Sequence, residues 1–516
     1  MEKFYVTTAI DYVNAAPHIG HAYEKIAADI VARYQRLRGK EVFFLTGVDE
    51  HGSKVEKTAQ AAGKTPQVFC DEMSEKFQIA WSSLLISNDY FIRTTEERHK
   101  KVVQEVFRRM TEKGDVYKGK YSGLYCEGCE DHLRERDLDE SGNCPNHKRP
   151  PRIFEEENYF FRLSGYKEAL RKWLTEDSGV VRPEGRRKEV LNQLDDEEFG
   201  DFSISRDRNS LKWGIPVPGD PQQVIYVWID ALTNYITGAG FLTDETLFKR
   251  FWPADLHLLG KDITKFHAIY WPAILMSLDL PLPRLVFGHG FITVEGQKMS
   301  KTLGNVMDPL YLVEQYGADA IRYFLFASNS FDQDGDFSRH EFISLVNSHL
   351  ANSLGNLLNR TLSLIERNAG GKVPGGMVNQ ASLSLARQAE VDYCRLMDEL
   401  EFAKAIESAF ALVNEANRYL NEQKPWTQFK EGKLEEGGSV LLTALELLKQ
   451  AAVLLLPVTP GLSARILEQL GFTGPFDGLT FKDVLFQETI PSGQPIVNRG
   501  PVFQRIDETE SAATTV

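Results

Sequence analysis

The chain has 516 residues, which is too long for one compact core, so we expect about two to four domains. Apolar residues make up 42% of the sequence and charged residues 26%, a composition that excludes a wholly disordered chain. Acidic residues outnumber basic ones by 73 to 59, and the formal net charge is -14. This excess gives no overall electrostatic attraction to nucleic acid or to an anionic membrane, so a polyanionic partner would require local basic patches.

Cysteine is rare, with five residues: Cys70, Cys126, Cys129, Cys144 and Cys394. So few cysteines exclude a disulfide framework. No apolar run in the sequence approaches the roughly 18 to 20 residues that span a bilayer. The N-terminus has no charged segment followed by an apolar stretch and a cleavage site. We therefore expect a cytoplasmic protein with no membrane segment.

The N-terminal segment predicts a βαβ unit. Residues 4–10 are apolar and rich in β-forming side chains, which is typical of a buried parallel strand. Residues 18–38 carry apolar side chains at three- and four-residue spacing, which predicts a helix that stops near Gly39. Residues 41–46 predict a second buried strand. Such a unit indicates a parallel α/β sheet.

The middle of the chain differs, because residues 116–222 combine the clustered cysteines with charge runs and turn residues. Further strands are predicted at residues 224–229, 256–259 and 285–287. A sheet that starts, is interrupted and resumes indicates an insertion into an α/β domain. After about residue 310 the pattern is helical, and Asp308 with Pro309 is typical of a helix start.

Long amphipathic stretches predict helices at residues 342–365, 383–418 and 439–456, and glycine-rich residues 370–376 predict a loop. We therefore divide the chain into six segments: a first α/β half (1–115), an insertion (116–222), a second α/β half (223–293), a connecting region (294–350), a helical domain (351–495) and a polar tail (496–516). We expect the tail to be mobile, because its residues are polar and irregular.

The element Pro17-His18-Ile19-Gly20-His21 lies between the first strand and the first helix. The first turn of such a helix binds anions, because free N–H groups and the positive end of the dipole point outward there. His18 and His21 lie on one helical face, and Gly20 lets a flat ligand approach the backbone. The pattern predicts a nucleotide whose phosphates face the histidines. The alternative is that both histidines merely cap and pack the helix start.

A second element, Lys298-Met299-Ser300-Lys301-Thr302, follows the strand predicted at residues 285–287. Two lysines in a short loop can close over a developing polyphosphate charge, although lysine-rich loops are commonly solvated surface. Together the two elements resemble the signatures of the class I aminoacyl-tRNA synthetases, a His-Ile-Gly-His element after the first strand and a Lys-Met-Ser-Lys-Ser loop after the last. Thr302 stands where that loop has serine.

Over about residues 3–490 the chain most closely resembles the methionyl-tRNA synthetases, on four further segments: residues 8–14, 47–52, 226–231 and 260–263. The resemblance implies a Rossmann-like parallel sheet interrupted by a zinc-binding insertion and followed by an α-helical bundle that binds the anticodon. It implies the activation of L-methionine with ATP and Mg²⁺, and transfer from methionyl-adenylate to the 3′-terminal adenosine of initiator and elongator tRNA(Met). We expect a monomer, because the chain stops short of the C-terminal dimerising module of some relatives.

The resemblance also assigns the adenylation site. His18 and His21 would contact the phosphates on one side, and Lys298 and Lys301 would close over the leaving pyrophosphate. The residues implied in ATP binding are His18, Gly20, His21, Asp262, Lys298, Ser300 and Lys301. The residues implied in methionine binding are Ile10, Tyr12, Asp49, Trp228, Tyr235 and His267, of which Asp49 would hold the ammonium group. Leu232 stands where some relatives have proline, which leaves the pocket wall there open.

The spacing Cys126-x2-Cys129-x14-Cys144-x2-His147 is typical of a tetrahedral zinc site. Four local ligands close the coordination shell, so we expect one structural zinc ion rather than a catalytic one. In the helical domain, the resemblance implies that Asn356, Arg360 and Trp426 read the anticodon, through paired donors and acceptors and through stacking.

Two rival interpretations are weaker. One is a synthetase for another apolar amino acid, but the insertion is too short for the large editing domain of the leucine, isoleucine and valine enzymes. The other is a catalytically silent tRNA-binding protein, which the intact His18, His21, Lys298 and Lys301 argue against.

Overall fold

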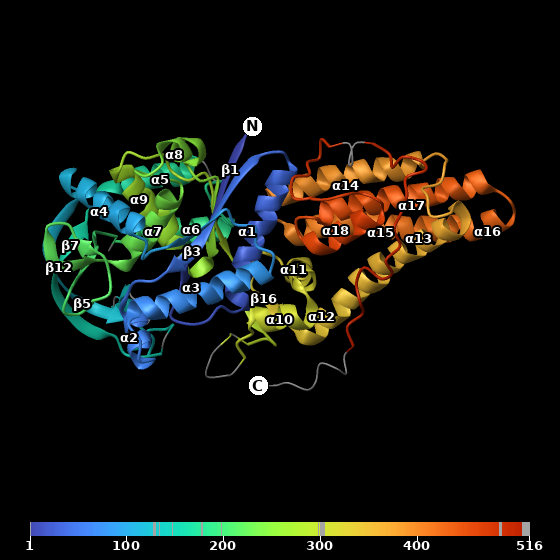
Figure 1. The fold of residues 1–516 in the computed structure, drawn as a ribbon. Coiled ribbons are helices and arrows are strands. Elements are labelled where there is room, and N and C mark those ends of the chain that lie inside the picture. The colour runs from blue at the N-terminus through green and yellow to red at the C-terminus, as the bar shows by residue number, and fades with distance from the viewer. Residues whose placement is uncertain are drawn as a thin grey trace.

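The computed structural model describes residues 2–126, 131–133, 135–146, 148–176, 179–197, 199–297, 299, 305–483 and 488–507. It has two parts, an α/β part that holds the N-terminal strands and an elongated group of helices formed by residues 356–469 (Figure 1). The first helix of the chain lies between them.

The main sheet has seven parallel strands: β1 (Lys3–Thr8), β2 (Asp11–Tyr12), β3 (Glu41–Asp49), β4 (Tyr90–Arg93), β8 (Val181–Arg182), β13 (Leu256–Gly260) and β14 (Val286–His289). Their order is β2-β3-β1-β13-β14-β8, with β4 also paired to β3. Val6 of β1 lies opposite Phe44 on one side and Leu256 on the other. The strand order reverses at β1, and ligands of such sheets bind at the carboxyl ends of the strands there. The strands predicted at residues 4–10, 41–46, 256–259 and 285–287 are confirmed.

Helix α1 (Ile19–Leu37) follows the predicted pattern, with His18 as its N-cap and Arg38 as its C-cap. Gly39 then adopts a φ of 78°, a left-handed conformation that ends the helix. The other helices of the α/β part are α2 (Ser53–Ala61), α3 (Pro66–Ser83), α4 (Glu97–Glu112), α5 (Lys167–Glu176), α6 (Glu184–Asp195), α7 (Val227–Gly238), α8 (Glu245–Phe251) and α9 (Trp271–Ser277). Short 3-10 or π-helical turns are η1 (Glu135–Asp137), η2 (Leu163–Tyr166), η3 (Lys261–Ile263) and η4 (Phe266–Tyr270).

Two antiparallel sheets occupy the region predicted as an insertion. One has the order β6-β5-β7-β9, and its strands are β5 (Val116–Cys126), β6 (Asp131–Leu133), β7 (Arg152–Phe161) and β9 (Phe202–Ser203). The other has the order β10-β12-β11, and its strands are β10 (Ser205–Asp207), β11 (Pro216–Val217) and β12 (Asp220–Ile225). Between these strands in the sequence, β8 pairs with β14 and extends the main parallel sheet.

The strand predicted at residues 224–229 is wrong in part. β12 ends at Ile225 and belongs to an antiparallel sheet, and residues 227–238 form α7. All ten residues of α7 that follow Trp228, from Ile229 to Gly238, are buried. A helix buried on almost every side has the same continuous apolar pattern as a buried strand, so periodicity alone does not separate the two.

The connecting region pairs β15 (Ile292–Val294) with β16 (Gly335–Phe337), and it contains α10 (Pro309–Tyr316), α11 (Ala318–Ala327), α12 (Arg339–Val346) and η5 (Asn347–Gly355). As predicted, Asp308 caps α10, and its Oδ1 accepts from the backbone N–H of Leu310 at 2.8 Å. The helical domain contains α13 (Asn356–Ala369), α14 (Gln380–Asp398), α15 (Phe402–Gln423), α16 (Pro425–Lys430), α17 (Leu434–Leu455) and α18 (Pro460–Gln469).

The single helical stretch predicted at residues 383–418 is wrong, because the chain turns between α14 and α15. At this turn Leu400 adopts a left-handed backbone conformation, with a φ of 62°, and its side chain is buried. Within the described part of the chain, α17 is the one helix long and apolar enough to cross a membrane, and 89% of its most apolar window is buried among the neighbouring helices. Tertiary packing therefore accounts for its composition.

The tail predicted to be mobile from residue 496 is docked on the helices as far as residue 507. Ile496 and Val502 are buried. The side chain of Asn347 in η5 donates to the carbonyl of Ile506 at 2.9 Å and accepts from its N–H at 2.8 Å. Phe503 and Ile506 also pack on the apolar core, and the overall polarity of the segment conceals these four apolar side chains.

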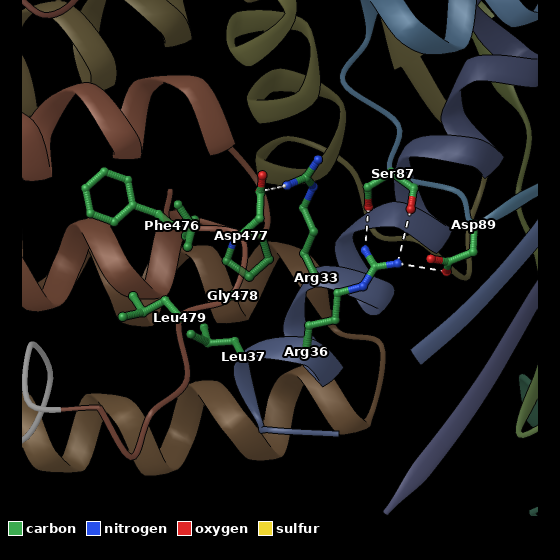
Figure 2. A pocket seen from close by; sticks show the side chains of 11 residues that line it. Arg33, Arg36, Leu37, Ser87, Asp89, Phe476, Asp477, Gly478 and Leu479 are labelled. Carbon is green, nitrogen blue, oxygen red and sulfur yellow. Dashed lines mark hydrogen bonds and ion pairs between the residues drawn. The ribbon is translucent and has the colours of Figure 1, made fainter. Parts of the chain in front are cut away.

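Charged side chains join the two parts where α1 meets the helical domain (Figure 2). Arg33 donates to Asp477 at 2.9 Å, and Arg36 donates to Ser87 and Asp89 beside a cavity of about 390 Å³. Deeper in the junction, Arg322 of α11 is fully buried and donates to Asp29 of α1 at 2.6 Å. The same guanidinium donates to the carbonyls of Leu84, Pro457 and Val458.

Candidate functional site

The histidine element forms a capping box at the start of α1. The N–H of Gly20 donates to Nδ1 of His18 at 3.1 Å, and the N–H of His18 donates to Nδ1 of His21 at 3.2 Å. The two rings stack with centroids 3.8 Å apart. Burial, the ring of His18 and the charge of Lys25 lower the pKa of His21 well below its usual value. Because Nδ1 is the acceptor in both rings, each neutral imidazole carries its proton on Nε2.

The second element comes close to the first. Lys298, Ser300 and Lys301 lie outside the described residues, but Met299 between them is described. A Cβ built on Gly20 would lie 3.1 Å from Cε of Met299 and 2.9 Å from Cε1 of His18. Further along the chain, the carbonyl of Met307 accepts from the N–H of Ile19 at 3.0 Å. The structure thus brings together two elements that lie almost 280 residues apart.

Predicted site residues also lie at the carboxyl ends of neighbouring strands. Tyr12 of β2 pairs with Asp49 at the end of β3, and the carbonyl of Asp49 accepts from the N–H of Val13. Asp262 follows β13, and its Oδ1 would lie 2.9 Å from a Cβ built on Gly260. These positions surround the carboxyl end of β1, where the strand order reverses.

Four aromatic side chains of α7 and η4 pack in two pairs. The hydroxyl of Tyr235 hydrogen-bonds Nε2 of His267 at 2.7 Å, and Nδ1 of His267 hydrogen-bonds the carbonyl of Ile263 at 3.0 Å. A carbonyl only accepts, so Nδ1 carries the proton and Nε2 accepts from the tyrosine. Burial lowers the pKa of His267 to about 4, so the ring is neutral at pH 7. Beside this pair, Trp228 stacks on Phe266 with centroids 3.6 Å apart and planes 7° apart.

His257 supports this wall, and sequence reasoning missed it. It lies within β13, and Trp271 donates to its Nε2 at 3.2 Å while its Nδ1 hydrogen-bonds Thr7 at 2.6 Å. Its ring lies 4.3 Å from that of Tyr235. Burial and the neighbouring His267 lower the pKa of His257 well below its usual value. The sequence did contain a signal for this residue, because His257 lies between two leucines in the strand predicted at residues 256–259.

A second buried histidine cluster fixes the end of β3 against α7. His51 hydrogen-bonds Oδ2 of Asp230 at 2.6 Å, and His99 of α4 hydrogen-bonds Oδ1 at 2.8 Å. All three side chains are buried. Burial opposes ionisation of Asp230, but His51 and His99 lower the pKa of its carboxyl to about 2. The carboxylate therefore joins the segment that carries Asp49 to the helix that carries Trp228 and Tyr235.

Half of the predicted zinc ligands can be placed. Cys126 ends β5 and Cys144 begins a tight turn in which the N–H of Lys148 donates to the Cys144 carbonyl at 2.8 Å. Both cysteines are buried. Cys129 and His147 lie outside the described residues, and among the described residues no three metal-binding side chains cluster.

The three predicted anticodon residues lie on neighbouring helices. Arg360 of α13 donates to the side-chain oxygens of Asn421 at 2.9 Å and Asn417 at 3.3 Å, both on α15. Asn356 is exposed one turn before Arg360, and Trp426 is partly exposed in α16, shortly after Asn421. Burial lowers the pKa of Arg360. α13 and α16 lie in the part of the molecule away from the main sheet (Figure 1).

Comparisons with known proteins agree with this arrangement. Residues 4–151 and 147–362 match the tRNA synthetases class I (M), and residues 373–515 match the anticodon binding domain of methionyl tRNA ligase. The chain is 45% identical to the methionine--tRNA ligase of Thermotoga maritima, over 98% of this chain and 80% of the relative. It is 44% identical to that of Thermosynechococcus vestitus, over 98% and 97%.

A solved structure gives the same result. Mycobacterium tuberculosis methionyl-tRNA synthetase in complex with methionyl-adenylate is similar with a TM-score of 0.93 and 41% identity, over 98% of this chain and 100% of that one. Both halves of the chain match the same family and the likeness extends over almost its full length, so the chain belongs to the methionyl-tRNA synthetases, a family of class I aminoacyl-tRNA synthetases.

Proposed function

We propose that the protein is a methionine--tRNA ligase, which activates L-methionine with ATP and transfers it to the 3′-terminal adenosine of tRNA(Met). The observation that carries this proposal is the approach of Met299 to Gly20, at the reversal point of the sheet, in a chain that matches the family from end to end. Initiator and elongator tRNA(Met) are both proposed substrates.

The capping box supports the phosphate-binding role of His18 and His21. Each ring accepts a backbone N–H through Nδ1, which leaves Nε2–H as a donor for phosphate oxygens. Donors held in place before the reaction stabilise charge that develops in the transition state. Lys298, Ser300 and Lys301 would act from the opposite side, with Gly20 allowing close approach of ATP and Asp262 holding its ribose. Mg²⁺ would accompany ATP as part of the substrate.

The neutral aromatic wall supports recognition of a thioether. Methionine has no polar group beyond its backbone atoms, so shape and soft sulfur–aromatic contacts must provide the selectivity. Trp228, Tyr235 and His267 are held by stacking and hydrogen bonds, with His267 uncharged. Ile10 packs on the same apolar cluster as Trp228. Tyr12 would also line the methionine pocket, and Asp49 would hold the substrate ammonium.

We propose that Cys126, Cys129, Cys144 and His147 bind one structural zinc ion. The burial of Cys126 and Cys144, one at a strand end and one at a tight turn, fits a site whose thiolates are kept from solvent. The ion would cross-link the two loops of the insertion. In the purified protein, metal analysis should find about one zinc per chain. Cys144→Ser should abolish it and Cys394→Ser should not; a metal-free, folded and fully active protein would contradict the site.

We also propose that Asn356, Arg360 and Trp426 read the anticodon. Asn417 and Asn421 hold the Arg360 guanidinium at a fixed position, which supports a role in binding a base edge. We propose the same division of the chain into six segments, with boundaries after residues 115, 222, 293, 350 and 495. The protein is proposed to be a cytoplasmic monomer.

ATP–pyrophosphate exchange tests the proposed activity. Exchange with methionine should exceed exchange with leucine, isoleucine, valine or cysteine by about 10²-fold in kcat/KM, because a shape-matched pocket separates such side chains by that order. Aminoacylation of tRNA(Met) should follow in the same preparation. Absence of methionine-dependent exchange, together with intact tRNA binding, would identify a silent tRNA-binding protein instead.

A further inference from the structure

Lys25 is a buried lysine on α1, four residues after His21, and only 1% of it is exposed. Its Nζ donates to the carbonyl of Ala9 at 2.9 Å, to Oδ1 of Asp11 at 2.6 Å and to Oε1 of Glu24 at 3.0 Å. These three bonds use every donor of the ammonium group. A lysine this deeply buried needs such a full set of acceptors, because an unpaired buried charge is strongly unfavourable.

The network continues from Glu24 to the end of β14. Oε2 of Glu24 lies 3.2 Å from Nε2 of His289, and Nδ1 of His289 lies 2.7 Å from the carbonyl of Gly290. Burial opposes ionisation of Glu24, but Lys25 and His289 lower the pKa of its carboxyl. Both ring nitrogens of His289 therefore face oxygen acceptors. The cluster thus runs from residues 9–11 through α1 to the end of β14.

The cluster joins three segments that carry the proposed adenylation site. Residues 9–12 carry Ile10 and Tyr12, two proposed contacts of methionine. α1 carries the histidine element, and the segment after His289 leads through β15 to the second element. The ammonium of Lys25 binds the first segment on both sides of Ile10, at the Ala9 carbonyl and at the Asp11 side chain. No role for Lys25 follows from the two signature elements themselves.

We propose that Lys25 is a positioning residue, which holds residues 9–12 against α1 and thereby fixes the wall of the methionine pocket. The inference rests on the proposed function, since it concerns the same pocket. Without the ammonium, the half-buried Ala9 carbonyl and the buried Asp11 side chain lose this donor, and the segment must shift to hydrate them. The ATP contacts depend instead on the capping box of His18, which Lys25 does not form.

Steady-state ATP–pyrophosphate exchange by the full chain tests this role through Lys25→Met. We expect the KM for methionine to rise by at least about 10-fold, with the KM for ATP and kcat at saturating methionine changed by less than about 3-fold. Lys449→Met is the matched control, because Lys449 is also 1% exposed, pairs with Glu446 at 2.8 Å and lies in the helical domain. The control should leave both KM values unchanged.

Asp11→Asn is the milder variant if Lys25→Met does not fold. Burial and the neighbouring Glu24 raise the pKa of Asp11 to about 7 against the attraction of Lys25, so a neutral side chain there is close to a state the native protein samples. It should raise the methionine KM in the same direction, by about 3-fold. Equal rises in the KM for methionine and ATP, an unchanged methionine KM, or the same rise in Lys449→Met would overturn the proposal.

Amide hydrogen exchange of the unliganded chain provides a readout that does not depend on activity. Lys25→Met should accelerate exchange in residues 9–16 relative to the rest of the sheet, whereas Lys449→Met should accelerate it only in the helical domain. Unchanged amide protection of residues 9–16 in Lys25→Met would overturn the positioning role, whether or not the protein catalyses methionine-dependent ATP–pyrophosphate exchange. The unaltered protein could instead show no methionine-dependent ATP–pyrophosphate exchange while the amide protection of residues 9–16 still depends on Lys25. That result would refute the proposed function and leave the positioning role intact.

Discussion

The α/β part and the helical part bury charge very differently. The α/β part encloses clusters such as Lys25 with Asp11 and Glu24, or Asp230 with His51 and His99. After residue 351 the fully buried charged side chains among the described residues are Glu446 and Lys449, which pair with each other on α17. The remaining core of that part is dominated by leucine, valine and alanine.

The difference follows from what each part is proposed to bind. A small polar substrate must be surrounded, so its contacts are held by side chains that are themselves buried and bonded. A base of single-stranded RNA is reached from outside, so its contacts sit at the surface of rigid helices: Asn356 is exposed, and Arg360 and Trp426 are partly exposed. Four substitutions test this contrast, in order of the expected size of effect.

Arg322→Met should have the largest effect, on stability. It removes four hydrogen bonds, one to Asp29 of α1 and three to the carbonyls of Leu84, Pro457 and Val458. The buried Asp29 carboxylate then keeps Arg33 as its cationic partner and Ser87 as its other donor. Breaking a buried ion pair on one side lowers the free energy of unfolding by about 3 to 5 kcal/mol. Urea denaturation should measure this loss, while the KM for methionine in the folded protein stays unchanged. A rise of that KM would show that the junction also shapes the pocket.

His21→Asn should lower kcat for pyrophosphate exchange by about 10²-fold, because it removes one preorganised phosphate donor. Stability should change little, since the side-chain oxygen of asparagine can accept the backbone N–H of His18 in place of Nδ1 of the imidazole. His340→Asn is the control, because His340 is an exposed histidine on α12. A loss confined to the KM for methionine, with kcat intact, would contradict phosphate binding by His21.

Trp426→Ala should weaken tRNA charging and spare pyrophosphate exchange. Loss of one stacked base lowers binding by about 1 to 3 kcal/mol, which would appear as a higher KM for tRNA(Met). Trp426→Phe keeps an aromatic ring and should restore much of the affinity. Equal losses in charging and exchange by Trp426→Ala would refute a separate anticodon-binding role.

Tyr235→Phe should have the smallest effect, a rise of a few-fold in the KM for methionine. It removes the hydrogen bond that orients His267, and a bond of this kind contributes about 0.5 to 1.5 kcal/mol. Tyr323→Phe is the matched control, because Tyr323 hydrogen-bonds His349 at 2.7 Å in the junction of α11 and η5. The same rise in the control would mean that a buried tyrosine–histidine bond affects activity without belonging to the pocket.

Local features were the predictable ones. The periodicity of α1 and the stop at Gly39 depend on residues within a few positions of each other, and the structure confirms them. The apolar run at residues 224–229 and the long stretch at residues 383–418 misled, because a continuous apolar pattern does not reveal whether a buried segment is strand or helix, or where it turns.

The sequence also suggested that a chain with a net charge of -14 has no general attraction to nucleic acid. The family assignment shows why this inference was too coarse, since net charge sums over the whole surface and a binding face uses only part of it. The low cysteine count argued against a disulfide framework, and the spacing of three of the five cysteines with His147 then predicted a zinc site.

By itself the sequence determined the two signature elements, the strands at the centre of the sheet and the helical character of the C-terminal half. Each rests on short-range spacing or on residue chemistry. Only the tertiary structure decided that Met299 meets Gly20, that β8 extends the main sheet and that Lys25 binds both sides of Ile10. These contacts join residues whose separation in the chain carries no periodicity, so burial and charge pairing become visible only once the segments are packed together.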